Sequence, residues 1–335
     1  MPFWQRSSPE DEQRRLQAQQ EAEASRRSLE AGDLPLQASR RLSEETAAGH
    51  PLFSSDLSTK EFALTRNVGY QPLSQVMGSS IYHIGWQYAR TYASYPSESE
   101  LTTISQAHMR AAQLALSRLG KEAVLLKAHG VIGVRLVTRD YEWGNNMLEY
   151  TAIGTAIQLP NTPLPQRPFL SDLSGQEFWT LLQAGYSPVG IAVGYCSYYV
   201  SLGSYLAGQM RGWFNWSNQE IDPFSKGIYT ARDLAMNRAV NMARSFNASG
   251  IVGMHIGCER KVIDYETDNP TRYYMDFIVR FSAIGTAIAA QRPDHVIPSP
   301  TPTLTLTDLR PGQRGETREL TVREYRQDAN LPLHR

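Results

Sequence analysis

The chain has 335 residues, with 33 basic and 33 acidic side chains and therefore no net charge. This balance disfavours a general nucleic-acid binder, which needs a basic surface. Its two cysteines, Cys196 and Cys258, lie in different sequence contexts. They disfavour a disulfide framework and favour a reducing, cytoplasmic compartment.

Neither a signal peptide nor a transmembrane segment is expected. The N-terminus runs into a charged stretch without the apolar core of a signal peptide. Residues 190–208 carry no charge and are long enough to be considered as a membrane span. They also contain four glycines, four tyrosines and three serines. So many polar side chains favour a strand over a helix in lipid.

Polar or proline-rich segments flank and divide the chain. Residues 1–54 are rich in Gln, Glu, Arg and Ser and predict a mobile arm with a helix over 10–30. Residues 159–170 contain four prolines and predict a stiff linker. Residues 291–335 are rich in Pro and Thr and predict an extended tail with one short strand at 304–309.

The two segments between them, 55–158 and 171–290, repeat one another. Ser55-Asp56-Leu57-Ser58 returns as Ser171-Asp172-Leu173-Ser174, 116 residues later. A glycine-containing junction, 128–133, returns as 248–253 after 120 residues. The hexapeptide Ala-Ile-Gly-Thr-Ala-Ile occurs at 152–157 and again at 283–288. We call these segments the first and second repeats, because an internal repeat defines the architecture.

Each repeat predicts the order strand, helix, strand, strand. The first strands are expected at 73–84 and 189–200. In the second repeat, apolar residues from Ile228 to Phe246 recur every three or four positions, which predicts a helix with one buried face. The first repeat carries most of the same stripe from His108 to Leu126. Two strands follow as a hairpin, because Gly144-Asn145 is a turn signal.

Six glycines recur within these units and are interpreted as structural turn, cap or close-packing positions. They are Gly130, Gly133, Gly154, Gly250, Gly253 and Gly285. The first glycine of each junction, Gly130 or Gly250, falls where a helix would end. A phosphate-binding loop would instead need its glycines at a helix N-terminus.

The fold class predicted is therefore α+β, with two tandem β-α-β-β units and flexible N- and C-terminal tails. Each unit is a small antiparallel sheet packed on one helix. The last strand of each unit is apolar on both faces. One helix covers only one face of a sheet, so the second face must pack between repeats or between chains.

The order β-α-β-β, the Ala-x-Gly-x-x-Gly junction and the closing Gly-Thr-Ala strand resemble the YbjQ-like family, also described as a heavy-metal-binding domain. The resemblance covers 60–158 and 176–289 and implies a tandem version of its dodecin-subunit-like fold. Single-repeat members form pentameric rings in which extra strands join neighbouring subunits. The resemblance therefore implies a homo-oligomer, as a pentamer or a ring of fewer chains.

The residues themselves give little support for a metal site or an enzyme. The chain has no Cys-x-x-Cys, and His255 and Cys258 would point to opposite faces of a strand. On the helix stripe, His108 is expected to be packed or hydrogen-bonded. Asp264, Glu266 and Asp268 alternate along one strand, so a weak site for a hard cation is an alternative to a solvated hairpin arm. We predict no cofactor and no catalytic residues, with a metal ion as the alternative.

Aromatic side chains gather after the first strand of each repeat. With two arginines, they define a candidate subunit-interface or ligand patch: Trp86, Tyr88, Arg90, Tyr205, Arg211, Trp213, Phe214 and Trp216. Tyr and Trp supply large contact areas with a polar edge. The patch predicts either packing within the oligomer or contact with a protein partner, a lipid surface or a small ligand.

Glu149 and Arg280 occupy equivalent positions in the two repeats and have opposite charges. If repeats alternate around a ring, the two residues would face each other and favour alternation. The sequence therefore predicts a non-catalytic, ring-forming scaffold that binds partners through its tails or aromatic loops. A binder of a metal ion or small ligand between subunits is the second hypothesis, and an enzyme is the third.

Overall fold

A computed structural model describes most of the chain. The residues described are 9–47, 54–84, 97–141, 147–203, 220–266, 273–291, 303–307 and 317–321. Residues 1–295 form one compact unit and residues 296–335 a second. In the second unit, β9 (Thr303–Thr307) pairs antiparallel with β10 (Thr317–Thr321), close to the strand expected at 304–309.

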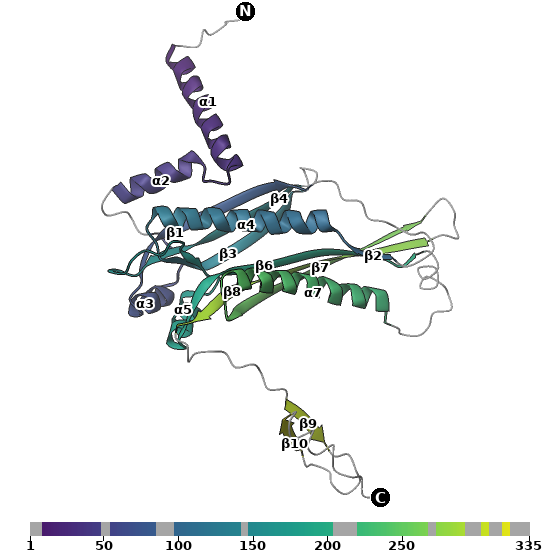
Figure 1. The fold of residues 1–335 in the computed structure, drawn as a ribbon. Coiled ribbons are helices and arrows are strands. Elements are labelled where there is room, and N and C mark those ends of the chain that lie inside the picture. The colour runs from purple at the N-terminus through teal and green to yellow at the C-terminus, as the bar shows by residue number, and fades with distance from the viewer. Residues whose placement is uncertain are drawn as a thin grey trace, which may run out of the picture. The chain divides into compact units, whose positions relative to one another are not determined.

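The compact unit is mixed α+β, as predicted. Its helices are α1 (Pro9–Glu30), α2 (Leu36–Ala47), α3 (Thr59–Asn67), α4 (Thr102–Leu125), α5 (Gly175–Gln183) and α7 (Asp222–Ser245). Figure 1 shows α4 running across one sheet and α7 across another. Among the described residues, no helix is long and apolar enough to cross a membrane.

The first sheet has the strand order β1-β4-β3-β5. Its strands are β1 (Gln71–His83), β3 (Gly130–Tyr141), β4 (Met147–Gln158) and β5 (Phe169–Leu170). The long strands pair antiparallel, and β5 runs parallel to β3. The last two residues of the predicted linker thus belong to the sheet.

The second sheet has the strand order β2-β6-β8-β7. Its strands are β2 (Ser97–Glu100), β6 (Tyr186–Ser201), β7 (Gly250–Glu266) and β8 (Tyr273–Ala290). The three long strands have the same relative order as those of the first sheet. The edge strand β2, however, comes from the first repeat, which the sequence did not predict.

Glycines bring each long helix close to the first strand beneath it. A Cβ atom on Gly78 would lie 2.1 Å from the carbonyl oxygen of Ala115, and one on Gly194 would lie 1.9 Å from that of Ala235. Such distances are impossible for a real side chain. The alanines of the predicted stripe are fully buried here because only small residues fit between helix and sheet.

The predicted cap glycines have other roles. Helix α4 ends at Leu125, and the left-handed residue after it is Lys127 (φ 54°), whereas Gly130 begins β3. A Cβ on Gly130 would lie 2.3 Å from the ring of Phe169, so this glycine permits close packing. In the second repeat the left-handed residue is Asn247 (φ 56°), and Gly250 begins β7.

The remaining four glycines belong to the strand pairs. Gly133 and Gly253 have φ of 63° at the register shift of β3 and β7, a conformation that favours glycine. A Cβ on Gly154 would lie 2.7 Å from Val131, and one on Gly285 would lie 2.9 Å from Ile251. These four positions therefore set the close approach of neighbouring strands.

The repeated Ser-Asp-Leu-Ser motifs each end in a helix cap. Ser58 precedes α3 and Ser174 precedes α5, and each side chain accepts a hydrogen bond from the backbone N–H of a glutamate three residues later. The side chains of those glutamates, Glu61 and Glu177, accept hydrogen bonds from the serine backbone N–H groups, which completes a capping box in each repeat.

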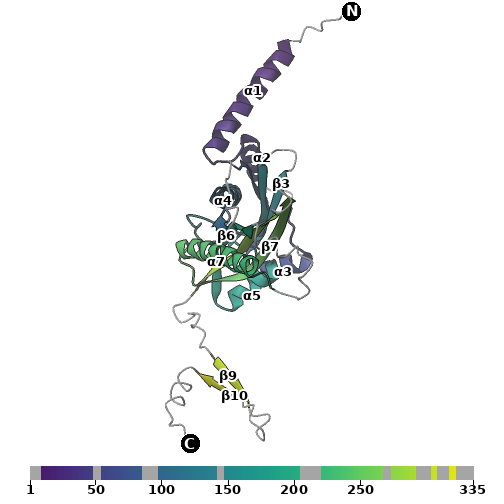
Figure 2. The ribbon, with the colours of Figure 1, turned by 90° about the vertical axis from the view of Figure 1, so that its right-hand side faces the viewer.

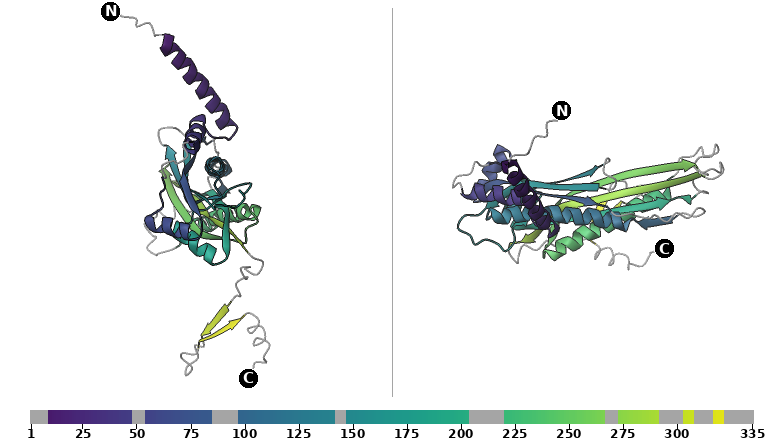
Figure 3. Two further views of the ribbon diagram at one scale, coloured as in Figure 1. Left: turned by 90° about the vertical axis from the view of Figure 1, so that its left-hand side faces the viewer. Right: turned by 90° about the horizontal axis from the view of Figure 1, so that it is seen from above.

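Helix α2 and the C-terminal end of α1 contact α4, and the mobility expected for the arm stays a prediction. Leu42 of α2 is fully buried. Arg118 of α4 donates hydrogen bonds to the carbonyl oxygens of Leu29 and Asp33, and Arg41 donates one to buried Glu122. Figure 2 shows α4 end-on between α2 and β6, and Figure 3 shows the N-terminal helices over α4 from above.

Candidate functional site

Among the described residues, one polar contact between the repeats lies at the edge of β6. Strand β2 pairs antiparallel with its last residues, from Ser97 opposite Ser201 to Glu100 opposite Tyr198. Leu101 then donates its backbone N–H to the carbonyl oxygen of Ser197 at 2.8 Å. The hydroxyl of Ser105 accepts from the Ser197 N–H at 2.9 Å. The first repeat thus satisfies backbone groups that would otherwise be exposed on an edge strand.

An ion pair between Glu100 and Arg238 of α7 reinforces this contact. The Arg238 Nη1 to Glu100 Oε1 distance is 2.7 Å, and the two side chains are 29% and 15% exposed. Burial raises the pKa of Glu100, but hydrogen bonds from Arg238 and Ser105 and the charge of Arg238 lower it by more. The net result is a pKa below the ordinary value, so the carboxylate stays ionised at neutral pH.

Cys196 lies beside this pair and is buried. Burial, together with the negative charge of Glu100, raises the pKa of its thiol to about 12. A thiol is nucleophilic only as the thiolate. Cys196 is therefore a packing residue of the contact.

Helix α4 covers one face of β6, and α7 covers the other. Ile191 and Val193 belong to the same core as α4, whereas Ala192 packs with Ala239 and Ala243 of α7. Every residue of β6 from Gly190 to Ser201 is consequently buried. The second face of this sheet, which the sequence predicted to need a further partner, is thus covered by α4 of the same chain.

His108 lies at the centre of the contact. Its ring stacks on Tyr195 at 3.8 Å between centroids, and its Nδ1 is 3.0 Å from the hydroxyl oxygen of Tyr150. The prediction that His108 is packed and hydrogen-bonded is confirmed. A cavity of about 170 Å³ adjoins it, and Thr138, Glu259, Arg280 and Ser282 also line this space.

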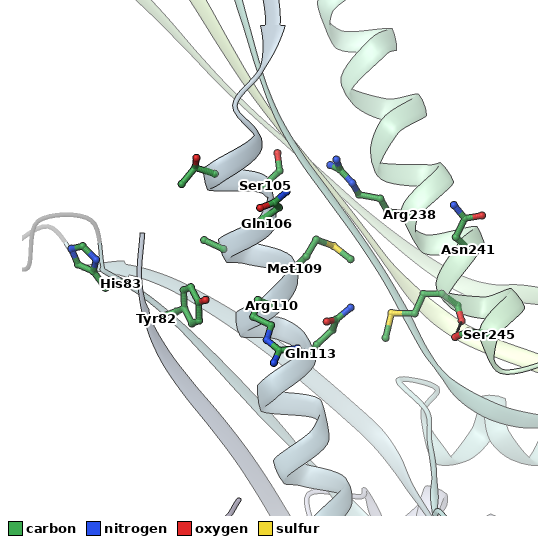
Figure 4. A pocket seen from close by; sticks show the side chains of 13 residues that line it. Tyr82, His83, Ser105, Gln106, Met109, Arg110, Gln113, Arg238, Asn241 and Ser245 are labelled. Carbon is green, nitrogen blue, oxygen red and sulfur yellow. Dashed lines mark hydrogen bonds between the residues drawn. The ribbon is translucent and has the colours of Figure 1, made fainter. Parts of the chain in front are cut away.

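A larger groove of about 880 Å³ lies between α4 and α7 (Figure 4). Gln106, Arg110 and Gln113 line it from α4, and Arg238 and Asn241 line it from α7. These side chains offer hydrogen-bonding groups to a contacting surface, and Arg110 adds a positive charge.

Arg118 of α4 is the counterpart of Arg238 in the first repeat, but its surroundings differ. Arg118 is only 7% exposed and donates from Nη1 to the carbonyl oxygen of Ser79 at 2.6 Å. Within the described part of the chain, no carboxylate lies within ion-pairing distance of it. Burial lowers the pKa of this guanidinium. Arg238, by contrast, has Glu100.

The first sheet also exposes apolar side chains on the face away from α4. Met77 and Ile81 of β1 are 48% and 63% exposed, and Val137 of β3 is 45% exposed. The burial of β1 alternates along the strand, whereas that of β6 does not. The face equivalent to the one that α4 covers in the second sheet is thus partly open.

The predicted aromatic patch lies outside the described residues, in 85–96 and 204–219. The structure therefore leaves its two interpretations as predictions for Trp86, Tyr88, Arg90, Tyr205, Arg211, Trp213, Phe214 and Trp216.

Glu149 and Arg280 each interact within their own sheet. Glu149 accepts a hydrogen bond from Thr151 at 2.9 Å, and Arg280 lies 3.9 Å from Glu259 on the neighbouring strand. The hypothesis that they specify alternation between chains stays a prediction.

Across the described ranges, no group of three or more His, Cys, Asp or Glu side chains is arranged to hold a metal ion. Asp264 and Glu266 belong to β7, and Asp268 lies outside the described residues.

The interface residues Glu100 and Arg238 were missed at the sequence level, although a signal was present. The helices of the two repeats are offset by 120 residues, and the residues of the contact recur at this offset. The pairs are Glu100 and Glu220, Leu101 and Ile221, Ser105 and Ser225, and Arg118 and Arg238. Comparing charged residues at this offset, in addition to glycines and apolar residues, identifies the set.

The chain is similar to the encapsulin nanocompartment protein Rv1762c of Mycobacterium tuberculosis. The two sequences are 36% identical over 232 residues, which cover 68% of this chain and 84% of that relative. The chain therefore belongs to the family of this protein. No family model matches the chain, and no solved structure matches it.

Proposed function

We propose that this protein is a non-catalytic scaffold that assembles with further copies of itself as a component of a protein nanocompartment. The observation that carries the proposal is the contrast between the two sheets. Both faces of β6 are buried from Gly190 to Ser201, whereas alternate residues of β1 are exposed or half-buried. An exposed apolar sheet face marks a surface that another protein covers.

The relative supports the biological setting, since its name describes it as a protein of an encapsulin nanocompartment. The polar residues where β2 contacts β6 support a non-catalytic role. Glu100 and Arg238 neutralise each other, and the Cys196 thiol has a pKa of about 12. These groups stabilise a contact and are poorly suited to acid–base or nucleophilic chemistry.

The resemblance to the YbjQ-like family belongs to the same proposal. It is supported by the common order of the long strands in the two sheets and by the helix that lies on each. It implies two tandem units per chain and a ring as the form of the assembly.

Native mass spectrometry of the purified full-length chain, with sedimentation of lysate from the organism that encodes it, tests the proposal. We expect a discrete oligomer without additional mass, and the chain in the fraction of nanocompartment-sized particles. A monomer at micromolar concentration would contradict self-assembly. Absence from the particle fraction would contradict the nanocompartment role. A fixed additional mass would favour the alternative function, a binder of a metal ion or small ligand between subunits.

A further inference from the structure

We infer that the first sheet binds the second repeat of another copy, through the same contact that joins the two repeats within the chain. This inference rests on the self-assembly proposed above and identifies its surfaces. Each copy would use two different surfaces. One is the β1 edge and open face of its first sheet, and the other is the start of its α7.

The buried charge of Arg118 is the first argument. A guanidinium that is 7% exposed is costly without a carboxylate partner. Arg118 donates three hydrogen bonds to carbonyl oxygens, those of Leu29, Asp33 and Ser79. A guanidinium has five N–H groups, so two remain for a carboxylate.

The internal repeat identifies that carboxylate. Arg238 is the counterpart of Arg118, and its partner Glu100 reaches it from the other repeat. The counterpart of Glu100 is Glu220, which is exposed two residues before α7. Glu220 of a second copy would therefore pair with Arg118.

Backbone groups on the edge of β1 give an independent argument. At the β6 edge, Leu101 and Ser105 bind the backbone of Ser197. The counterpart of Ser197 in β1 is Ile81, since Ser197 pairs with Arg280 and Ile81 pairs with the equivalent Glu149. Ile221 and Ser225 of the second copy, the counterparts of Leu101 and Ser105, would bind the backbone of Ile81 in the same way.

The open face of the first sheet, which points away from α4, gives a third argument. Leu116 of α4 belongs to the core that contains Val193 of β6. Their counterparts are Met236 of α7, which is half-buried, and Met77 of β1, which is 48% exposed. Docking α7 of a second copy on the open face would bring these two methionines together and cover Ile81. Burial of such side chains drives association.

The contact uses unlike surfaces, so each added copy still presents one free surface of each kind. Such head-to-tail association gives a ring if the rotation between copies closes and an open filament if it does not. A symmetric contact, in which each copy uses the same surface, would instead stop at two chains.

Two variants with a matched control test the inference. Glu220→Lys places a cation against Arg118 and alters only the α7 surface. Ile81→Asp places a carboxylate on the open face and alters only the first-sheet surface. Glu23→Lys changes an exposed glutamate of α1, 69% exposed, and serves as the control. Circular dichroism and the thermal midpoint check that all three fold.

Native mass spectrometry and analytical ultracentrifugation would measure assembly. Each of the two interface variants should be monomeric alone, with self-association more than about 30-fold weaker than in the wild type. The control should assemble like the wild type. An equimolar mixture of Glu220→Lys and Ile81→Asp should form a heterodimer and nothing larger, since each retains one intact surface.

Several results would overturn the inference while leaving the proposed function in place. The wild type could assemble together with either folded interface variant, or the mixture could form no heterodimer. A monomeric wild type would instead overturn self-assembly itself, and the inference with it.

Discussion

Arg118 and Arg238 make the same hydrogen bond at equivalent places in the two repeats. Each donates from Nη1 to a strand carbonyl oxygen, that of Ser79 at 2.6 Å and that of Tyr195 at 2.7 Å. One helical turn further, Glu122 accepts from the backbone N–H of Met77, and the sulfur of Met242 accepts from that of Val193. Each helix is thus anchored to the outer edge of its first strand by two side chains; in β6 these contacts lie beyond the residues that pair with β2.

The ion pair across the repeats should contribute measurably to stability. Replacing Glu100 by Gln keeps its shape and leaves Arg238 partly buried without a counter-charge. We expect the free energy of unfolding to fall by about 1–3 kcal/mol. Urea denaturation measures it. Glu23→Gln, in an exposed pair of α1, should change it by less than about 0.5 kcal/mol. Equal effects at both positions would contradict the importance of the ion pair.

The glycines beneath the helices should tolerate no side chain. Gly78→Ala and Gly194→Ala would each force a helix away from its strand, because the added Cβ meets backbone atoms at 2.1 Å and 1.9 Å. We expect a loss of at least about 3 kcal/mol, or failure to fold. Gly120→Ala is the control within α4, where no atom lies within 4 Å of the added Cβ. It should stabilise the protein by about 0.5–1 kcal/mol, as measured by thermal unfolding.

The docking of the N-terminal helices can be tested at a single leucine. Leu42 is fully buried, so Leu42→Ala should destabilise the protein by about 2–4 kcal/mol. Leu16 of α1 is 57% exposed, and Leu16→Ala should have an effect below about 0.5 kcal/mol. Chemical denaturation compares the two variants. An undetectable effect of Leu42→Ala would support the prediction of a mobile arm.

The two thiols should differ in reactivity. Cys196 is buried with a pKa of about 12, whereas Cys258 is partly accessible. At pH 8 a thiol reagent should therefore modify Cys258 first and Cys196 only after unfolding. Mass spectrometry of peptides from protein labelled before and after denaturation measures the order. Equal rates in the folded protein would show that the contact opens readily.

The contact between the repeats should weaken in acid. The folded-state pKa of Glu100 lies below its ordinary value of 4.5. Its contribution to stability is therefore complete above pH 4.5 and is lost as the pH falls through the lower, folded-state pKa. We expect the difference in thermal midpoint between the wild type and Glu100→Gln to be largest near neutral pH and to shrink as the pH falls below 4.5. A difference that does not change with pH would contradict this assignment.

Patterns within single elements predicted the long strands and helices well. The runs at 73–84 and 189–200 became β1 and β6, and the stripe ending at Phe246 became α7. Periodicity is a local property, so these elements could be found without tertiary information. The short helices α3 and α5 were missed, although Ser58 and Ser174 with their glutamates are capping signals.

Features that depend on distant contacts could not be found in this way. Strand β2 reads Ser-Glu-Ser-Glu, which has no apolar alternation, and its extended form is set by pairing with β6. The N-terminal arm is polar throughout, and its packing depends on a few contacts such as buried Leu42. Likewise, the partners Glu100 and Arg238 are far apart in sequence.

The position of β2 has a consequence for synthesis on the ribosome. This strand and the outer side of α4 emerge early, but their partner β6 begins only at Tyr186. The contacts of β2 and of this side of α4 with β6 therefore form only after the second repeat is synthesised, and such long sequence separations slow folding. A nascent chain halted between the repeats would expose the apolar side of α4, and it would be the species most in need of a chaperone.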